Sequence, residues 1–186
     1  VLHRILDGLL RLMAPILSVT AAEAWEHLHG LNENSPIEQS VFFAELPEVE
    51  DIAPDADLDQ RWKRLLSLRS EITKMLETAR KDKVIGLALD AEVLLLADDG
   101  ELTAFLSGKE ELLCELCIVS SLKTVSEAGD AVFAASEEIK GMHIAVRPAP
   151  GGKCERCWMI SPSVGQDSEH PALCSRCAAV VRSLSA

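Results

Sequence analysis

The sequence predicts an α+β protein: a helical-bundle fragment, a small mixed or antiparallel sheet domain with helices, and a four-cysteine zinc-binding tail. Three observations predict this order. Helical periodicity marks the N-terminal segment and the middle of the chain, short strand-like runs follow, and two Cys-x-x-Cys pairs lie near the C-terminus. The predicted boundaries are 1–43 for the bundle fragment, 44–57 for a linker, 58–146 for the sheet domain and 147–186 for the tail.

The N-terminal segment has the pattern of an amphipathic helix. Apolar residues recur at three- and four-residue steps over 1–17. Pro15 is expected to kink or end this helix because it removes a backbone donor. The chain starts at Val1, inside the helical pattern and without an initiator Met. We therefore expect it to be a piece of a longer protein.

A second short helix is expected to begin at Thr20, which forms a capping-box pattern with Glu23. Trp25 lies in this helix and is expected in the core. Residues 30–57 are rich in Pro, Asn and acids and are interpreted as loop. The apolar run 41–43 within them is expected to pack on the bundle.

Helical periodicity returns over 58–83, with Trp62 on the apolar face. The opposite face is basic, and two interpretations are open for it. It is either a solvated surface with ion pairs such as Glu77 with Lys81, or a helix that contacts phosphate groups. Its cations are Arg61, Lys63, Arg64, Arg69, Lys74, Arg80, Lys81 and Lys83.

The elements of the sheet domain follow this helix. We expect a strand over 87–97, ended by Asp98-Asp99-Gly100, and then a helix over 101–117. Further strands are expected near 118–125, 131–134 and 143–147. A helix, a strand, a helix and then several strands indicate a small α+β domain.

The distribution of charge limits the partners. A net charge of −12 argues against a simple nucleic-acid binder, because cations dominate contact with phosphates. Cations nevertheless gather in 59–83, with eight basic and four acidic residues, and in 147–186, with five and three. Such basic segments in an acidic chain permit localised RNA contact. Four thiolates and one zinc ion would leave the tail near neutral, so steering would fall to 59–83.

Two cysteine pairs have the spacing of a four-thiolate zinc site. Cys154 and Cys157 form the first pair, and Cys174 and Cys177 follow after sixteen intervening residues. Four protein ligands leave no coordination position for substrate, so this site is expected to hold structure. Iron in a rubredoxin-like site remains the alternative at this point.

A third Cys-x-x-Cys, formed by Cys114 and Cys117, is interpreted differently. It lies among Leu and Ile where a helix gives way to a strand, with no second pair at ligand spacing. We expect small buried thiols in the core. His170, between the two zinc-type pairs, is expected to be a surface residue.

Cations and one aromatic residue surround the first metal-type pair. A compact module that presents cations beside an exposed aromatic ring is suited to a phosphate backbone and one unstacked base. The alternative is that Trp158 covers the metal and the cations only solvate the site. The candidate RNA contacts are Trp158, Arg156, Lys153 and Arg176 in the tail, and Arg80, Lys81 and Lys83 at the end of the basic helix.

The sequence lacks the motifs of several classes of enzyme. The sequence has no glycine-rich phosphate loop, no Gly-x-Ser-x-Gly and no His-Glu-x-x-His, and we find no catalytic constellation. The first apolar stretch is interrupted by charges and is neither a signal peptide nor a membrane span. Six cysteines without a secretory segment indicate a reducing compartment, so a cytoplasmic location is expected.

Three stretches carry a family resemblance: Met13 to Glu26, with MAPILSVT, Trp25 and two acids; Arg80 to Ala91, with RKDKVIG and LDA; and Lys153 to Cys177, with KCERCW, VG, HP and LCSRC. They resemble the C-terminal region of bacterial isoleucyl-tRNA synthetase, from the end of its helical anticodon-binding domain to its zinc-binding tail. The chain departs from the family at Met159-Ile160, where His-Tyr is usual, and at Leu87-Ala88, where Ser is frequent.

The resemblance implies a parent aminoacyl-tRNA synthetase that joins isoleucine to its tRNA with ATP and has an editing activity. The ATP-site signatures and the editing domain are absent from this sequence, so no catalytic residue carries over. For this chain the resemblance implies zinc on the four cysteines of the tail and contact with the anticodon end of a tRNA for isoleucine. The other expected partner is the remainder of the synthetase, with no membrane and no DNA.

Two alternatives remain. The zinc tail is a purely structural tether that touches no RNA, or the chain is the zinc-finger tail of a DNA-repair glycosylase. The second predicts binding to duplex DNA and more cations than this acidic chain has.

Overall fold

The computed structural model describes residues 1–48, 53 and 55–185. The chain forms two compact units, Val1–Pro54 and Asp55–Ala186, which are described separately. The predicted linker 44–57 lies partly outside the described residues. Among those residues, no helix combines the length and the apolar character needed to cross a bilayer.

The first unit contains α1 (Leu2–Met13) and α2 (Ser18–His29), followed by the 3₁₀ turns η1 (Ile37–Gln39) and η2 (Val41–Phe43). The first helix ends before Pro15, as predicted. The expected capping box is wrong: α2 begins two residues earlier, after Leu17, and no side chain caps it. Thr20 therefore lies inside the first turn.

Trp25 anchors the small core of this unit. It is 6% exposed, and its indole N–H donates to the carbonyl of Gln39 at 2.8 Å. From the predicted apolar run 41–43, Val41 packs into this core, whereas Phe42 and Phe43 are exposed. Most apolar residues of α1 are also exposed: Leu2, Ile5, Leu6, Leu9 and Leu12.

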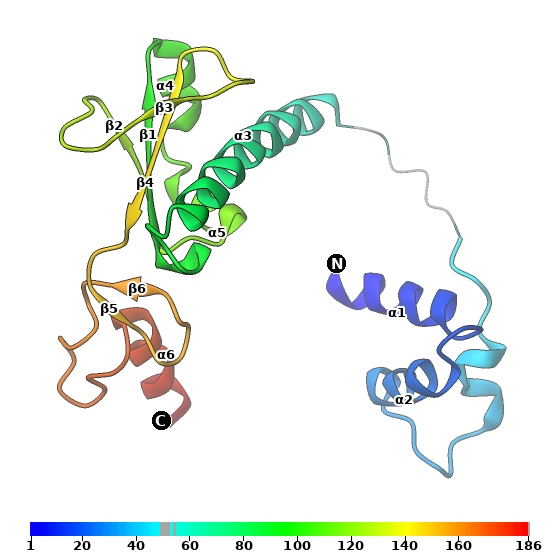
Figure 1. Cartoon of the computed structure of the whole chain (residues 1–186). Helices are drawn as coiled ribbons and strands as arrows, with labels where there is room; N and C mark the ends of the chain where they lie inside the picture. The colour runs from blue at the N-terminus through cyan, green and yellow to red at the C-terminus, as the bar shows by residue number, and fades with distance from the viewer. Residues whose placement is uncertain (49–52, 54, 186) are drawn as a thin grey trace. The chain divides into compact units, whose positions relative to one another are not determined.

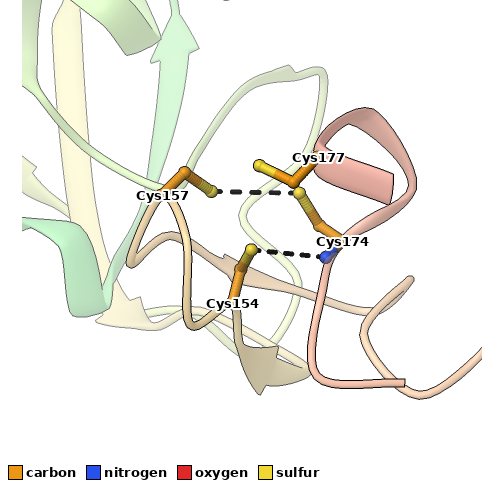
Figure 2. A group of neighbouring side chains, drawn as sticks. All are labelled: Cys154, Cys157, Cys174 and Cys177. Carbon is orange, nitrogen blue, oxygen red and sulfur yellow. Dashed lines mark hydrogen bonds between the residues drawn. The ribbon is translucent and has the colours of Figure 1, made fainter. Parts of the chain in front are cut away.

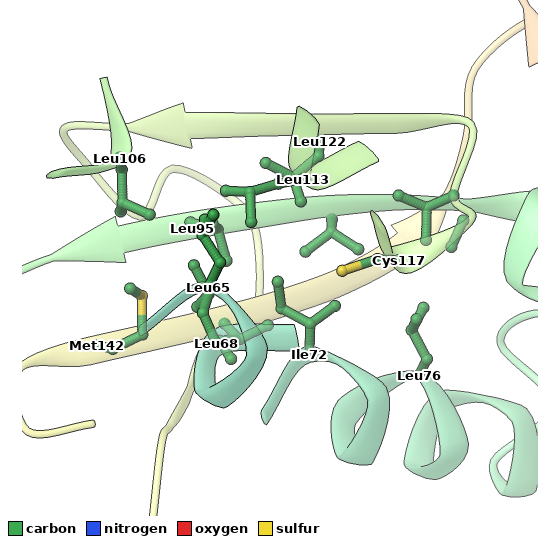
Figure 3. Close-up of a cluster of buried hydrophobic side chains, with 14 of the residues drawn as sticks. Leu65, Leu68, Ile72, Leu76, Leu95, Leu106, Leu113, Cys117, Leu122 and Met142 are labelled. Atoms are coloured by element: carbon green, nitrogen blue, oxygen red, sulfur yellow. The ribbon is translucent and has the colours of Figure 1, made fainter. Parts of the chain in front are cut away.

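The second unit begins with α3 (Ala56–Lys81), which Asp55 caps by accepting a hydrogen bond from the N–H of Leu58 at 2.9 Å. Its apolar face packs on the sheet through side chains at helical spacing (Figure 3): Leu65, Leu68, Ile72 and Leu76. Trp62 is not part of this core. The first turns of α3 extend past the sheet (Figure 1) and leave Trp62 41% exposed, so its predicted place on the buried face is wrong.

The sheet is mixed, one of the two forms that the sequence predicted, with strand order β2-β1-β4-β3. The central strand β1 (Ala91–Ala97) pairs in parallel with β2 (Ser121–Val125) and antiparallel with β4 (Met142–Pro148). The short strand β3 (Ala134–Ala135) pairs with the outer edge of β4. The turn η3 (Ala88–Asp90) precedes β1 where the sequence predicted strand.

Two helices replace the single helix predicted over 101–117. They are α4 (Gly100–Leu106), capped by Asp99, and α5 (Glu110–Cys117). Gly108 separates them with φ = +71°, a left-handed conformation that glycine adopts without strain. The buried residues of α3, α4 and α5 join one cluster with Val93 and Leu95 of β1, so these helices cover one face of the sheet.

A buried carboxylate fastens the outer edge of the sheet domain to α3. Glu71 is 3% exposed and accepts hydrogen bonds at one oxygen from the hydroxyl of Ser136 and the N–H groups of Glu137 and Glu138. Its other oxygen accepts from Lys74 Nζ at 2.6 Å. The pKa of Glu71 is lowered to about 2, mainly by Lys74 and then by Ser136.

The tail consists of a short hairpin, β5 (Gly152–Lys153) and β6 (Ile160–Ser161), and the helix α6 (Ser175–Ser185). One hydroxyl attaches it to the sheet domain. Ser120 accepts a hydrogen bond from the N–H of Ile160 at 2.7 Å and donates to the carbonyl of Leu89 at 2.5 Å.

Candidate metal centre

The four predicted ligands come together. Cys154 and Cys157 lie in the loop between β5 and β6, Cys174 precedes α6, and Cys177 lies in its first turn (Figure 2). Their sulfurs all lie within 4.8 Å of one another, and the Cys157 and Cys174 sulfurs are 3.8 Å apart. A tetrahedral zinc site with Zn–S bonds of about 2.3 Å requires S–S separations of about 3.8 Å. The donor set and its spacing fit zinc.

The backbone of the first pair forms a tight knuckle that turns both sulfurs the same way. The N–H of Trp158 donates to the carbonyl of Cys154 at 2.8 Å, and the N–H of Cys154 donates to the carbonyl of Met159 at 2.9 Å. Gly151 permits the approach of the two hairpin strands. A Cβ there would lie 2.3 Å from the carbonyl carbon of Ser161.

Hydrogen bonds to sulfur favour the thiolate that a metal requires. Burial raises the pKa of the Cys154 thiol, but backbone N–H groups of Cys157, Cys174 and Arg156 oppose this effect, and the pKa is lowered from its ordinary value. One of these bonds, from the N–H of Cys174 to the Cys154 sulfur, measures 3.3 Å. Negative charge is therefore stabilised at Cys154, whereas burial and hydrogen bonds with the neighbouring thiols raise the pKa of the Cys174 thiol to about 11.

Two of the predicted RNA-contacting cations turn toward this charge. Arg156 donates from Nη1 to the Cys177 sulfur at 3.6 Å. The pKa of Arg176 is raised because its guanidinium donates to the Cys157 sulfur. Both side chains remain exposed at the surface. Arginine has five N–H donors, so one bond to sulfur leaves others for a further partner.

Trp158 stands on the outside of the knuckle. It is 63% exposed, so it does not bury itself over the sulfurs. Its φ of +65° lies in the left-handed region, which is unfavourable for a bulky side chain. Lys153, on β5, is also exposed, and within the described part of the chain it has no ion-pair partner.

The basic face of α3 divides into two groups. Several of its cations fasten the helix to the domain: Arg64 pairs with Glu101, and Lys74 pairs with Glu71. Arg80 pairs with Glu77 at 2.5 Å, in place of the expected pair between Glu77 and Lys81. Arg69 donates to the carbonyl of Leu116 at 3.0 Å. Five exposed cations, Arg69 among them, have no ion-pair partner among residues 1–48, 53 and 55–185; the other four are Arg61, Lys63, Lys81 and, just beyond the helix, Lys83.

The third cysteine pair is separate from the metal site. Cys117 lies in the main core, and Cys114 packs against it. The Cys114 thiol donates to the carbonyl of Val119 at 2.9 Å. Burial raises the pKa of both thiols, that of Cys117 to about 11, so they stay protonated near neutral pH. His170 is half-buried and does not belong to the four-sulfur cluster.

Sequence reasoning missed one feature near the metal site. A cavity of about 570 Å³ opens between α5, the start of β2 and the hairpin of the tail. Ile118 stands at its edge, 61% exposed and with φ = +56°. No motif marks such a cavity, because its walls come from segments that are far apart in the sequence.

Two family models match this chain, one in its N-terminal half and one in its tail. A family model described as "Anticodon-binding domain of tRNA ligase" matches residues 1–95, and one described as "Zinc finger found in FPG and IleRS" matches residues 151–180. The four cysteines lie inside the second match, which indicates a zinc site.

Curated relatives match along nearly the whole chain. The isoleucine–tRNA ligase of Desulfotalea psychrophila is 50% identical over 99% of this chain, and that of Geobacter sulfurreducens 43% identical over 98%. The chain spans about a fifth of the length of these relatives, 20% and 19%. The anticodon-binding match covers residues 1–95 of 186, more than half of the chain. The chain belongs to the tRNA-ligase family defined by this anticodon-binding domain, and it resembles the isoleucine-specific ligases within it.

Proposed function

We propose that this chain is the part of an isoleucine–tRNA ligase that binds the anticodon end of the tRNA for isoleucine. In this proposal one zinc ion on Cys154, Cys157, Cys174 and Cys177 holds the knuckles in place and takes no part in chemistry. ATP is used by the parent enzyme elsewhere. The protein acts in the cytoplasm, where its free thiols remain reduced.

The observation that supports the proposal most strongly is the exposure of Trp158 together with its unfavourable backbone conformation. Trp158 is a large apolar side chain, 63% exposed, on a backbone conformation that disfavours it. An outlier of this kind persists where the surrounding structure enforces it, and such positions cluster at binding sites. A flat, exposed ring beside cations suits stacking on one unpaired base.

The cations have divided roles in this proposal. Arg156 and Arg176 compensate the thiolates with one N–H and face an RNA phosphate with others. Lys153, Lys81 at the end of α3 and Lys83 just beyond it contact the RNA backbone. Arg80 contributes less, because it is already paired with Glu77.

The test is a salt titration of binding between the zinc-loaded chain and a transcript of the isoleucine tRNA, with a valine tRNA as the control. Trp158→Ala is expected to weaken binding about 5- to 150-fold, since stacking on one base contributes about 1–3 kcal/mol. Trp62→Ala is the matched variant: Trp62 is also a partly exposed indole, but it lies on α3. Unchanged affinity in Trp158→Ala, with zinc content intact, contradicts the stacking role.

A structural tether is the second candidate, and the Ser120 linkage of the tail to the sheet domain favours it. It predicts that a folded, zinc-loaded chain binds neither tRNA. Removal of the metal would then lower stability without any separate effect on RNA.

A further inference from the structure

The cavity beside the metal site has the size and lining of a binding pocket. Its volume of about 570 Å³ lies in the range of small-ligand sites, about 300–1,000 Å³. Its walls are mainly apolar, and they come from the end of α5, the turn before β1 and the tail hairpin: Leu89, Ile118, Val119, Met159, Ile160 and Pro162.

Charged groups of both signs complete the lining. Lys123 of β2 and Arg176 of α6 are the cations, and Glu111 and Glu115 of α5 are exposed carboxylates. Glu92 also lines the cavity; it is fully buried and already paired with Lys123 at 2.7 Å and with Arg147 at 2.6 Å. A ligand with one anionic group, one flat apolar part and hydrogen-bond donors matches this combination.

Backbone strain occurs at the edge of this cavity. Ile118 follows α5 in the left-handed conformation, with φ = +56°, a position that glycine usually takes at the end of a helix. A β-branched residue is disfavoured there, and this one is also 61% exposed. Replacement by glycine would relieve the strain and remove an exposed apolar surface, so the fold alone does not account for isoleucine.

Trp158 has the same two unusual properties as Ile118, and it directly precedes Met159, which lines the cavity. Both Ile118 and Trp158 are large, exposed and left-handed. Trp158 is not itself a lining residue of the cavity, but Met159, the residue that follows it, is, so the knuckle lies next to the cavity.

We propose that this cavity receives one unstacked nucleotide of the RNA strand, adjacent to the nucleotide whose base stacks on Trp158. The base lies against Ile118 and Met159, a base amino group donates to Glu111 or Glu115, and the phosphate lies near Lys123 and Arg176. This inference rests on the proposed function, because it requires RNA at the knuckle. It adds a second nucleotide site, on the sheet domain.

The first experiment uses Ile118→Gly in the full zinc-loaded chain. The variant is expected to melt at a higher temperature, since glycine tolerates the left-handed conformation, and to bind the isoleucine tRNA about tenfold more weakly. A gain of stability together with a loss of affinity is not expected from a purely structural position. Ile118→Asn, which also tolerates this conformation, provides a second variant. Leu112→Ala, on α5 but outside the cavity lining, is the control.

The outcomes separate the two proposals. If the parent chain binds no tRNA, the proposed function fails. If Trp158→Ala weakens binding while both Ile118 variants retain the parent affinity, the cavity inference is overturned and the proposed function stands. Unchanged tRNA affinity with an altered oligomeric state would assign the cavity to a second copy of the chain and would equally overturn the inference.

A second experiment tests the chemistry of the base. Mononucleotides are titrated into the chain while the methyl signals of Ile118 and Met159 are followed by NMR. CMP, GMP and AMP carry an exocyclic amino group on the base and are expected to shift these signals more than UMP does. Equal shifts for all four would contradict the role given to Glu111 and Glu115.

Discussion

The contribution of the buried Glu71 carboxylate to the stability of the sheet domain can be measured by a single substitution. The substitution Glu71→Gln keeps the shape of the side chain and removes its charge. In the parent chain this carboxylate accepts three hydrogen bonds at one oxygen and the Lys74 ammonium at the other. Its pKa is lowered from 4.5 to about 2.

The expected loss of stability can be calculated from the lowered pKa of Glu71. At about 1.4 kcal/mol per pKa unit, a change from 4.5 to about 2 corresponds to about 3 kcal/mol of stabilisation of the charged form. Lys74, the main cause, is 46% exposed, and water screening reduces the figure to about 2 kcal/mol. At a urea dependence of about 2 kcal/mol per M, Glu71→Gln should lower the unfolding midpoint by about 1 M.

The pH dependence has a defined sign. Because the folded pKa is depressed, the stabilisation is fully present above about pH 5 and is lost as the pH falls from 4.5 toward 2. The assay is urea unfolding followed by circular dichroism, with parent and variant compared at each pH so that loss of zinc in acid affects both. Glu77→Gln, which removes a half-exposed partner of Arg80, is the matched control and should change little. A difference of the same size at pH 7 and pH 3 would refute the argument.

Three further predictions concern the tail. Gly151→Ala should loosen the hairpin and lower zinc retention in a chelator competition, because the added Cβ would lie 2.3 Å from the backbone of Ser161; zinc retention equal to that of the parent would contradict this. Arg156→Met should release zinc to a chelator several-fold faster, since the Cys177 sulfur loses a charged donor, whereas a neutral result would limit Arg156 to RNA contact. Ser120→Ala should speed hydrogen exchange at the Ile160 amide by leaving it without its acceptor, and unchanged exchange would mean that other contacts hold the hairpin.

The sequence predicted best the elements whose residue pattern extends over many positions or is fixed by chemistry. The helix over 58–83 has many periods of apolar residues, and its observed bounds, Ala56–Lys81, differ by two residues at each end. The four-cysteine site was predictable because ligand spacing is a chemical requirement that does not depend on the rest of the fold. The RNA-contacting residues and the domain boundaries stay predictions.

The features that sequence missed depend on tertiary geometry. Trp62 fits the apolar face of α3, but the sheet does not reach that far along the helix. The break at Gly108 is a single residue inside a helical pattern, and its consequence depends on where α4 must turn. Nothing in a linear pattern indicates that Ile118 adopts a left-handed conformation, since isoleucine is rarely found there.

The hydroxyl of Ser120 also constrains the order in which the molecule can assemble. Its two partners, Leu89 and Ile160, lie before β1 and within the tail hairpin, and β2 begins at the next residue. The hydroxyl meets Leu89 only once β1 and β2 have paired, with Glu92 opposite Ser121. The cysteine knuckles involve only contacts within the tail and form independently of that pairing. We therefore expect the knuckles to form before the tail docks, and pulse-labelled exchange during refolding should then protect the amide of Cys154 before that of Ile160.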